Sequence, residues 1–295
     1  MSSAYAIVTP VRDEAEGLPR LIASVAAQTM LPETWLLVEN GSTDESPAIA
    51  QRAADVHPWI RVVRIESPPA GERGVPIVRA IHAGVEALRP FPSVVAQLDA
   101  DLSLPPDYFE RLVRELDVSN RLGMVSGTCY ELEDDEWKER FTTGANVWGA
   151  ARAYRRECLE SVLPFVPRTG WDAIDVAQAN ALGWQTRTLR EIGFRHHRAE
   201  ASRERTRFTA WADQGRTSYF LGYRPSYLLL RALFRAPRDP GALGLVAGYA
   251  GAARRRDPRC EKPGVREWVR GQQRLRTIAG RAAEARGRRG DSSTH

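Results

Sequence analysis

The chain has 295 residues, of which 43% are hydrophobic and 27% charged, a composition typical of a soluble globular protein. Its three cysteines are too few and too far apart for a disulfide framework, and no apolar stretch is long enough to span a bilayer. Because the first residues also lack the pattern of a signal peptide, we expect a protein of the reducing cytoplasm.

Charge is distributed unevenly along the chain. Residues 1–195 contain 20 Lys and Arg against 28 Asp and Glu, whereas residues 196–295 contain 22 against 9. An acidic body followed by a basic C-terminal part indicates two different roles. We therefore expect a first domain over residues 1–200 and a basic, mainly helical extension over residues 201–295.

The N-terminal part of the chain alternates between two patterns. Short apolar runs at residues 5–9, 35–38, 60–65 and 94–99 predict buried strands, and each interval between them has apolar residues at helical spacing. This alternation is typical of βαβ units, which build a mostly parallel sheet with helices on both faces. The predicted fold class is therefore α/β, with a Rossmann-like sheet.

The fourth predicted strand ends in two acids, Asp99 and Asp101. Residues i and i+2 of an extended chain point to the same side, so both carboxylates reach one place at the carboxyl end of the strand, where open α/β sheets bind ligands. Hard oxygen ligands suit Mg²⁺ or Mn²⁺, which usually share their site with substrate phosphates. The alternative is a polar turn whose Asp residues only cap the next helix.

Further elements follow the acid pair. We expect a helix that Pro106 begins, a strand over residues 124–130, a helix after Thr169 that Gly183 ends, and a last strand over residues 184–189. The last strand leads to Phe194-Arg-His-His-Arg198. The pattern changes near residue 200, which marks the expected boundary.

Polar motifs follow the first, second and fourth predicted strands. They are Thr9-Pro-Val-Arg-Asp-Glu14, Val38-Glu-Asn-Gly-Ser-Thr-Asp44 and Leu98-Asp-Ala-Asp101, with Arg79 between the second and the third. In order and spacing they resemble the motifs of family 2 glycosyltransferases, over roughly the first two thirds of the chain. The resemblance implies a GT-A fold with a donor half over about residues 1–104 and an acceptor half over about residues 105–200.

The resemblance also implies an activity. The expected reaction is an inverting, metal-dependent transfer of a single sugar from a nucleotide-sugar, expected to be a UDP-sugar, to a hydroxyl acceptor. The Gln-x-x-Arg-Trp motif of processive polysaccharide synthases is not present, which favours single-sugar transfer.

The resemblance assigns residues to the donor and the ion. The nucleoside would be held by Thr9, Pro10, Arg12, Glu14, Glu39 and Ser42. Arg79 would lie near the phosphates or be an ordinary solvated helix residue. Asp101 would bind Mg²⁺ or Mn²⁺, Asp99 would bind the ribose or the ion, and His196 or His197 would add a ligand. Neighbouring residues of a strand point to opposite sides, so the two histidines cannot both face the ion.

Thr169-Gly-Trp-Asp172 resembles the family's acidic pair at a helix start, with Trp171 in place of Glu. Asp172 is the expected catalytic base, and as an Asp it also suits the N-cap of that helix. Asp175, one turn further, would hold the acceptor or simply favour the helix N-terminus. Trp171 would offer a flat face to a sugar or lipid acceptor, or pack in the core.

Two other functions fit parts of the sequence. A nucleotidyltransferase shares the sheet and the ion, but it needs a glycine-rich loop after the first strand, and residues 10–14 contain no glycine. The second alternative is a binding protein, in which a catalytically degenerate body binds nucleotides and the extension binds nucleic acid. The extension lacks a recognisable nucleic-acid module, so we do not expect nucleic acid as a partner.

The basic extension mixes bulky apolar residues with arginines over residues 219–256. On a helix, Leu230, Leu233 and Phe234 would share a face that an anionic membrane interface could bury. The competing interpretation is ordinary packing of these helices on the body or on a partner subunit. We expect a peripheral protein on the cytoplasmic face of the membrane, with a lipid-linked or cell-envelope acceptor.

Overall fold

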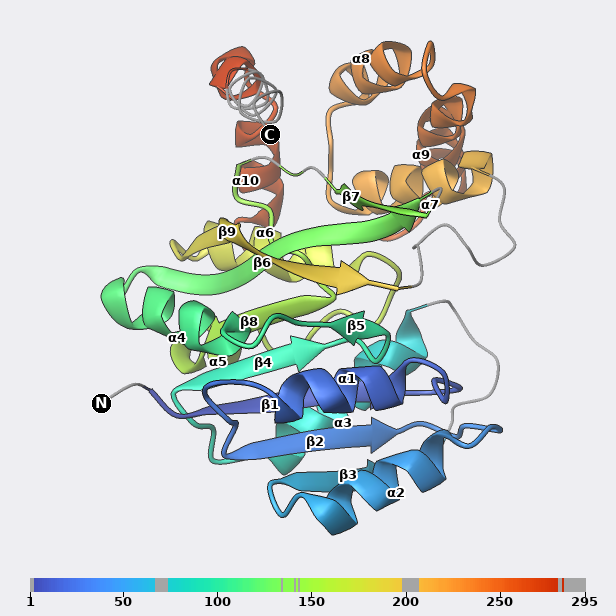
Figure 1. Cartoon of the computed structure of the whole chain (residues 1–295). Coiled ribbons are helices and arrows are strands. Elements are labelled where there is room, and N and C mark those ends of the chain that lie inside the picture. The colour runs from blue at the N-terminus through green and yellow to red at the C-terminus, as the bar shows by residue number, and fades with distance from the viewer. Residues whose placement is uncertain are drawn as a thin grey trace. The chain divides into compact units, whose positions relative to one another are not determined.

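The computed structural model describes residues 3–66, 74–133, 135–140, 142, 144–197, 207–280 and 283 (Figure 1). The chain divides into two compact units. One is formed by residues 1–179 and 183–199, and the other by residues 180–182 and 200–295.

Four parallel strands form the first half of the sheet in the first unit. They are β1 (Tyr5–Val11), β2 (Thr34–Glu39), β3 (Ile60–Arg64) and β4 (Val94–Leu98), in the spatial order β3-β2-β1-β4. Helices α1 (Leu18–Ala26), α2 (Ser46–Val56) and α3 (Val75–Ala87) connect them in turn. The predicted alternation is confirmed, and the carboxyl ends of these parallel strands lie at one edge, to the right in Figure 1.

The second half of the sheet is mixed. β8 (Ala151–Arg155) is antiparallel to β4 and to β6 (Leu122–Glu133), while β9 (Gln185–His196) runs parallel to β6. The short β5 (Leu102–Ser103) is antiparallel to the end of β9, and β7 (Glu136–Glu139) folds back on β6. Helices α4 (Tyr108–Val118), α5 (Arg156–Val162) and α6 (Trp171–Ala181) complete this part. Because Leu102 pairs with His196, the acid pair and the histidine pair meet at one place.

Both faces of the sheet are covered. In β2, Trp35 and Leu37 pack with residues of α1, α2 and α4, whereas Leu36 and Val38 pack with residues of α3, α5 and α6. Figure 1 shows α1 and α2 in front of the sheet and α3 behind it. Strands buried on both faces have continuous apolar sequences, which is the pattern that predicted them.

The described part of the second unit is helical. It contains α7 (Arg207–Phe220), α8 (Pro225–Arg235), the 3-10 helix η1 (Pro240–Leu243), α9 (Gly244–Arg255) and α10 (Val265–Gly271). Its core consists of Tyr219, Leu228, Ala232, Leu245, Tyr249 and Ala252. Among the described residues, no helix combines the length and the apolar character that a membrane crossing requires.

Helices α7 and α9 approach each other so closely that their backbones touch. A Cβ atom on Gly248 would overlap the carbonyl group of Ala212, and one on Gly215 would overlap the carbonyl oxygen of Leu245. A Cβ atom on Gly244 would meet α7 in the same way. Glycine is therefore required at these three positions for the helices to lie at this distance.

Candidate active site

The turns after β1 and β2 are joined by side chain to backbone hydrogen bonds. The Asp13 carboxylate accepts from the backbone N–H of Thr43 at 2.7 Å, and the N–H of Glu14 donates to Ser46 Oγ at 2.7 Å. The N–H of Asp13 donates to Ser42 Oγ at 3.2 Å. The first two sequence motifs therefore form one continuous polar surface at the carboxyl edge of the sheet.

The residues predicted to hold the nucleoside differ in exposure. The Thr9 side chain is fully buried and accepts from Trp35 Nε1 at 3.0 Å, and the Glu39 carboxylate accepts from the Ser42 N–H at 2.5 Å. Glu14 is buried, Pro10 is half-buried, and Arg12 and Arg79 are exposed. Ser42 lies between the two turns. Thr9 and Glu39 therefore shape the site rather than present free side chains to it.

Asn40, next to Glu39, was not among the predicted site residues. Its Nδ2 donates to the Pro76 carbonyl oxygen at 3.3 Å, but its Oδ1 is buried with no hydrogen-bond partner among the described residues. Buried amide oxygens are normally bonded. A ligand N–H at this edge would satisfy this oxygen.

Asp99 and Asp101 lie where β4 ends, Asp99 half-buried and Asp101 buried. The backbone N–H of Asp99 donates to the Ala150 carbonyl oxygen at 2.8 Å. A Cβ atom on Gly17 would be 3.0 Å from the Asp101 Cα atom, so the backbone just before α1 packs closely against this turn. Both acids are thus held by the backbone around them.

The ring of His196 lies between Asp101 and two buried residues of β6. Its Nε2 is 3.2 Å from Oδ1 of Asp101, and its Nδ1 is 3.9 Å from Oε1 of Glu131. Ligand atoms of Cys129, Glu131 and His196 all lie within 4.8 Å of one another. Cys129 and Glu131 were not predicted as site residues. The one feature of the sequence that could have pointed to them is their i, i+2 spacing, which places both on one face of a strand.

This cluster favours a positive charge. Burial acts to lower the pKa of His196, but hydrogen bonds to Asp101 and Cys129 and the charges of Asp101 and Asp99 raise it to about 11. The acids therefore stabilise an imidazolium, whose proton a divalent ion would displace. The carboxylate and imidazole groups present fit such an ion.

His197 points away from this cluster, as expected for the neighbouring residue of an extended strand. Its Nε2 lies 2.8 Å from Ser103 Oγ, and its ring meets the Trp137 ring edge-on at 5.0 Å. Burial and the charge of Arg20 lower the pKa of His197. Of the two histidines, His196 is therefore the one beside Asp101.

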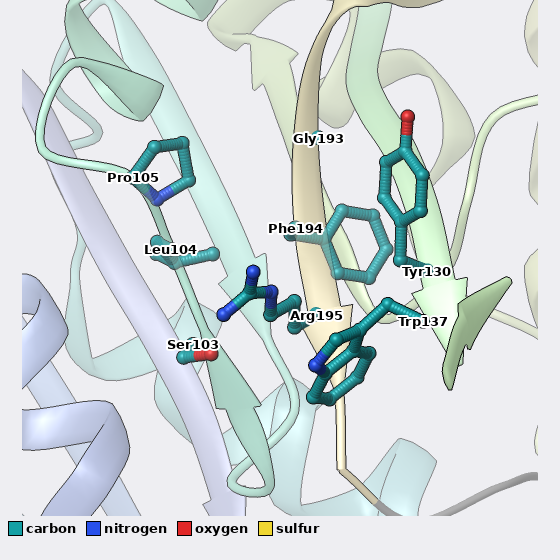
Figure 2. A pocket seen from close by; sticks show the side chains of 8 residues that line it. All are labelled: Ser103, Leu104, Pro105, Tyr130, Trp137, Gly193, Phe194 and Arg195. Atoms are coloured by element: carbon teal, nitrogen blue, oxygen red, sulfur yellow. The ribbon is translucent and has the colours of Figure 1, made fainter. Parts of the chain in front are cut away.

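A pocket opens beside the end of β9, with a cavity volume of about 350 Å³. Figure 2 shows the aromatic rings of Tyr130 and Trp137 on one side of β9 and the segment around Ser103 on the other. The Arg195 guanidinium lies 5.1 Å from the centre of the Trp137 ring. Sequence reasoning missed this pocket, because hairpin pairing of β7 on β6 brings Trp137 to it.

Asp172 lies in the first turn of α6, which begins at Trp171, so the N-cap interpretation is wrong. The Asp172 side chain is half-buried. A Cβ atom on Gly149 would be 2.9 Å from its Oδ2, so a larger residue there would displace this carboxylate. Gly149 lies two residues before the start of β8.

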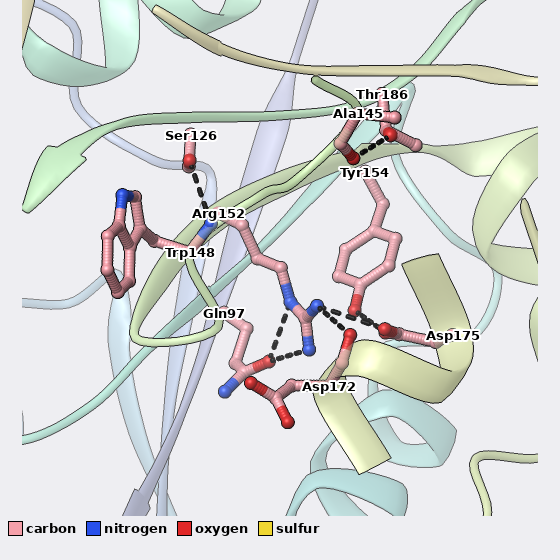
Figure 3. A network of polar contacts seen from close by, with 9 residues as sticks. All are labelled: Gln97, Ser126, Ala145, Trp148, Arg152, Tyr154, Asp172, Asp175 and Thr186. Atoms are coloured by element: carbon pink, nitrogen blue, oxygen red, sulfur yellow. Dashed lines mark hydrogen bonds and ion pairs between the residues drawn. The ribbon is translucent and has the colours of Figure 1, made fainter. Parts of the chain in front are cut away.

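Behind Asp172 lies a fully buried arginine, Arg152 of β8 (Figure 3). Its Nη1 donates to Asp175 Oδ1 at 3.1 Å and to the Asp172 carbonyl oxygen at 3.3 Å. Its Nε and Nη2 donate to Oε1 of Gln97 at 3.3 and 3.2 Å. Arg152 therefore connects β4, which leads to Asp99, with the start of α6.

Asp175 and Trp171, the predicted acceptor residues, belong to this buried network. Asp175 also accepts from the Tyr154 hydroxyl at 2.5 Å, so both of its oxygens are bound by the protein. Burial raises the pKa of Asp175 to about 6, although Arg152 and the Tyr154 hydrogen bond act to lower it. Trp171 packs in the core with the Arg152 guanidinium 4.7 Å from its ring centre. Both side chains therefore contact other residues of the protein interior.

Residues 6–171, more than half of the chain, match glycosyl transferase family 2. The chain belongs to this family. The family that the resemblance of its motifs predicted is thereby confirmed, and the nucleotidyltransferase alternative is not supported.

Two relatives of this family 2 member extend the comparison. The chain is 32% identical over 177 residues to an undecaprenyl-phosphate 4-deoxy-4-formamido-L-arabinose transferase of Pseudomonas fluorescens, covering 55% of this chain and 50% of that protein. It is 28% identical over 200 residues to an uncharacterized glycosyltransferase of Mycobacterium tuberculosis, covering 62% and 81%. The chain thus spans only half the length of the Pseudomonas protein.

Solved structures confirm the GT-A fold of this family 2 member. A mannosyltransferase from Pyrobaculum calidifontis, in complex with GDP-Man and Mn²⁺, matches with a TM-score of 0.55 and 18% identity over 97% of this chain and 80% of that one. GalNAc-T7, crystallised with UDP, GalNAc and Mn²⁺, matches with a TM-score of 0.59 and 12% identity over 85% and 55%.

Proposed function

We propose that this family 2 enzyme is an inverting, metal-dependent glycosyltransferase that moves a single sugar from a nucleotide-sugar to an acceptor. The observation that supports this most is the contact between Asp101 and His196, at the edge of the sheet where β1, β2 and β4 end. Open α/β sheets bind ligands at this edge. In this proposal the joined turns supply the rest of the donor site, and Asp172 on α6 supplies the base.

The donor's nucleoside is proposed to lie on the ends of β1 and β2 and the joined turns that follow them, which together contain Thr9, Pro10, Arg12, Glu14, Glu39 and Ser42. The buried Oδ1 of Asn40 is suited to accept an N–H from the base, because no residue that the structure describes donates to it. Arg79, exposed on α3, is available to the phosphates. UDP is the expected nucleotide, and the two structural neighbours contain a GDP-sugar or UDP.

Asp101 and His196 are the residues proposed to hold a Mg²⁺ or Mn²⁺ ion, with Asp99 on the ribose or the ion. The bound ion supplies positive charge that stabilises the nucleoside diphosphate as it leaves. Both structural neighbours were crystallised with Mn²⁺. Oε1 of Glu131 lies 3.9 Å from Nδ1 of His196, and Cys129 hydrogen-bonds the same ring, so both would fix its orientation.

Asp172 is proposed to act as the base. Its carboxylate takes the proton of an acceptor hydroxyl while the hydroxyl oxygen attacks the anomeric carbon, and the configuration at that carbon inverts. Arg152 and Gly149 position it, the first through the backbone carbonyl and the second by leaving space for the side chain.

The acceptor is proposed to be lipid-linked and part of the cell envelope, since curated relatives are named as undecaprenyl-phosphate sugar transferases. The enzyme would then work on the cytoplasmic face of a membrane. Whether Asp172 is needed as a base depends on the acceptor group whose oxygen attacks the sugar. A phosphate is already ionised near neutral pH and needs no base, whereas a hydroxyl does.

A panel of nucleotide-sugars tests the proposal. Each is incubated with the full chain in Mn²⁺ or in EDTA, and release of the nucleoside diphosphate is measured. We expect release with one nucleotide, dependence on the ion, and a product of inverted configuration when an acceptor is supplied. Release that is equal in EDTA, or retention of configuration, would contradict the mechanism.

A further inference from the structure

Helix α8 exposes four large apolar side chains. They are Leu229, Leu230, Leu233 and Phe234, exposed at 49%, 65%, 55% and 74%. At 100° per residue these positions lie on one continuous face of the helix. Leu228 and Ala232, on the other side, are buried in the core of the second unit. Helix α8 is therefore anchored by one side and presents the other to solvent.

Three arginines lie on one flank of this face, beyond Phe234. The Arg231 and Arg235 guanidinium groups lie 5.9 and 5.1 Å from the centre of the Trp211 ring, and that of Arg238 lies 5.9 Å from the Phe234 ring. The nearby Asp239 is engaged, since its carboxylate accepts from Trp211 Nε1 at 2.8 Å and from the Gly241 N–H at 3.0 Å.

The described part of the second unit also carries a net positive charge. Residues 207–280 contain fifteen Lys and Arg against five Asp and Glu. A partner that binds the apolar face must therefore tolerate or neutralise the positive charge around it. A second copy that paired through its own α8 face would bring the same positive charge and be repelled.

We propose that the exposed face of α8 docks on an anionic lipid bilayer, with its four apolar side chains in the interface and the arginines against the headgroups. An 11-residue helix is too short to cross a bilayer but suits the interfacial plane. Apolar burial and attraction to anionic lipid act together in such helices. The inference rests on the proposed lipid-linked acceptor for its purpose, because docking brings the enzyme to that substrate.

Flotation with vesicles tests the docking. The full chain is mixed at low salt with phosphatidylcholine vesicles that contain or lack about a third of phosphatidylglycerol, a fraction high enough for a strong surface potential. We expect flotation only with the anionic vesicles and its loss in high salt. The variant Leu230→Ser/Phe234→Ser should bind at least about tenfold more weakly, because it loses two of the four inserting side chains.

The matched control is Val118→Ser in the first unit, where Val118 is 79% exposed. Both variants change exposed side chains, so thermal unfolding should be unaltered, and the control should float like the wild type. Nucleotide-sugar hydrolysis, measured without vesicles, is independent of docking. Flotation without hydrolysis would refute only the proposed activity, and hydrolysis without flotation would refute only the docking.

Two results would overturn the inference. One is equal flotation of the wild type and the α8 double variant. The other is a dimer in sedimentation that the double variant dissociates, since the face would then belong to a second copy.

Discussion

The Nε2 atom of His196 lies 3.2 Å from Oδ1 of Asp101, across the junction of β5 and β9. Antiparallel pairing of these strands creates this contact between residues far apart in the sequence. It makes the end of β9 part of the same site as the acid pair, and several predictions depend on it.

Replacing Asp101 by Ala should abolish the metal dependence of nucleotide binding. Its carboxylate is a proposed ligand of the ion, and without it His196 is the only remaining member of the proposed ligand pair. Calorimetry with UDP and GDP in Mn²⁺ and in EDTA measures this. Asp107→Asn, a change of an acid at the N-cap of α4, is the control that should keep the wild-type difference. An unchanged difference in Asp101→Ala would remove that residue from the ion.

The two histidines should behave differently. His196→Gln should weaken the ion-dependent component of binding, whereas His197→Gln should leave it nearly intact, because His197 points to Ser103. Cys129→Ser and Glu131→Gln should weaken it by about 10- to 100-fold, the range seen when the support of a ligand histidine is lost. Calorimetry with Mn²⁺ ranks the four variants. Equal losses at His196 and His197 would show that the site binds its ion differently.

Asp172→Asn should lower transfer to a hydroxyl acceptor by about 10²–10⁴-fold while leaving donor affinity unchanged. The amide is close in size to the carboxylate but cannot take a proton. Single-turnover rates with hydroxyl and phosphate acceptors measure the effect. A normal rate with a phosphate acceptor and a slow rate with a hydroxyl would assign the base to hydroxyl substrates only. Normal rates with both would place the base elsewhere.

Arg152→Met should destabilise the first unit by about 3–5 kcal/mol, because it leaves the Asp175 carboxylate buried without its charged partner. The double variant Arg152→Met/Asp175→Leu should be less destabilised than the single one, since no unpaired charge remains. Chemical denaturation followed by tryptophan fluorescence measures both. Strictly additive effects would mean that the 3.1 Å contact contributes no coupling.

The sequence allowed the fold and the outline of the site to be predicted, because apolar runs and polar strand ends are local patterns. The contact of His196 with Asp101 was expected only through the family resemblance, and its geometry depends on the pairing of β5 with β9. Cys129, Glu131 and Arg152 were missed because their roles arise from long-range packing. Arg152 is one of two arginines in the five-residue strand β8, and the strand pattern alone does not show that it is the one buried, or which partners bind it there.

The glycines between α7 and α9 reverse a common rule of protein stabilisation. Replacing a helical glycine by alanine usually gains up to about 1 kcal/mol of stability through helix propensity. In α9 this gain is expected at Gly251, where an added methyl group would meet only the end of the Arg255 side chain at 3.4 Å. At Gly248, three residues earlier in the same helix, the methyl group would collide with the Ala212 carbonyl and force the helices apart. Thermal unfolding of the two alanine variants should therefore shift in opposite directions, so attempts to engineer thermostability must treat neighbouring glycines of one helix separately.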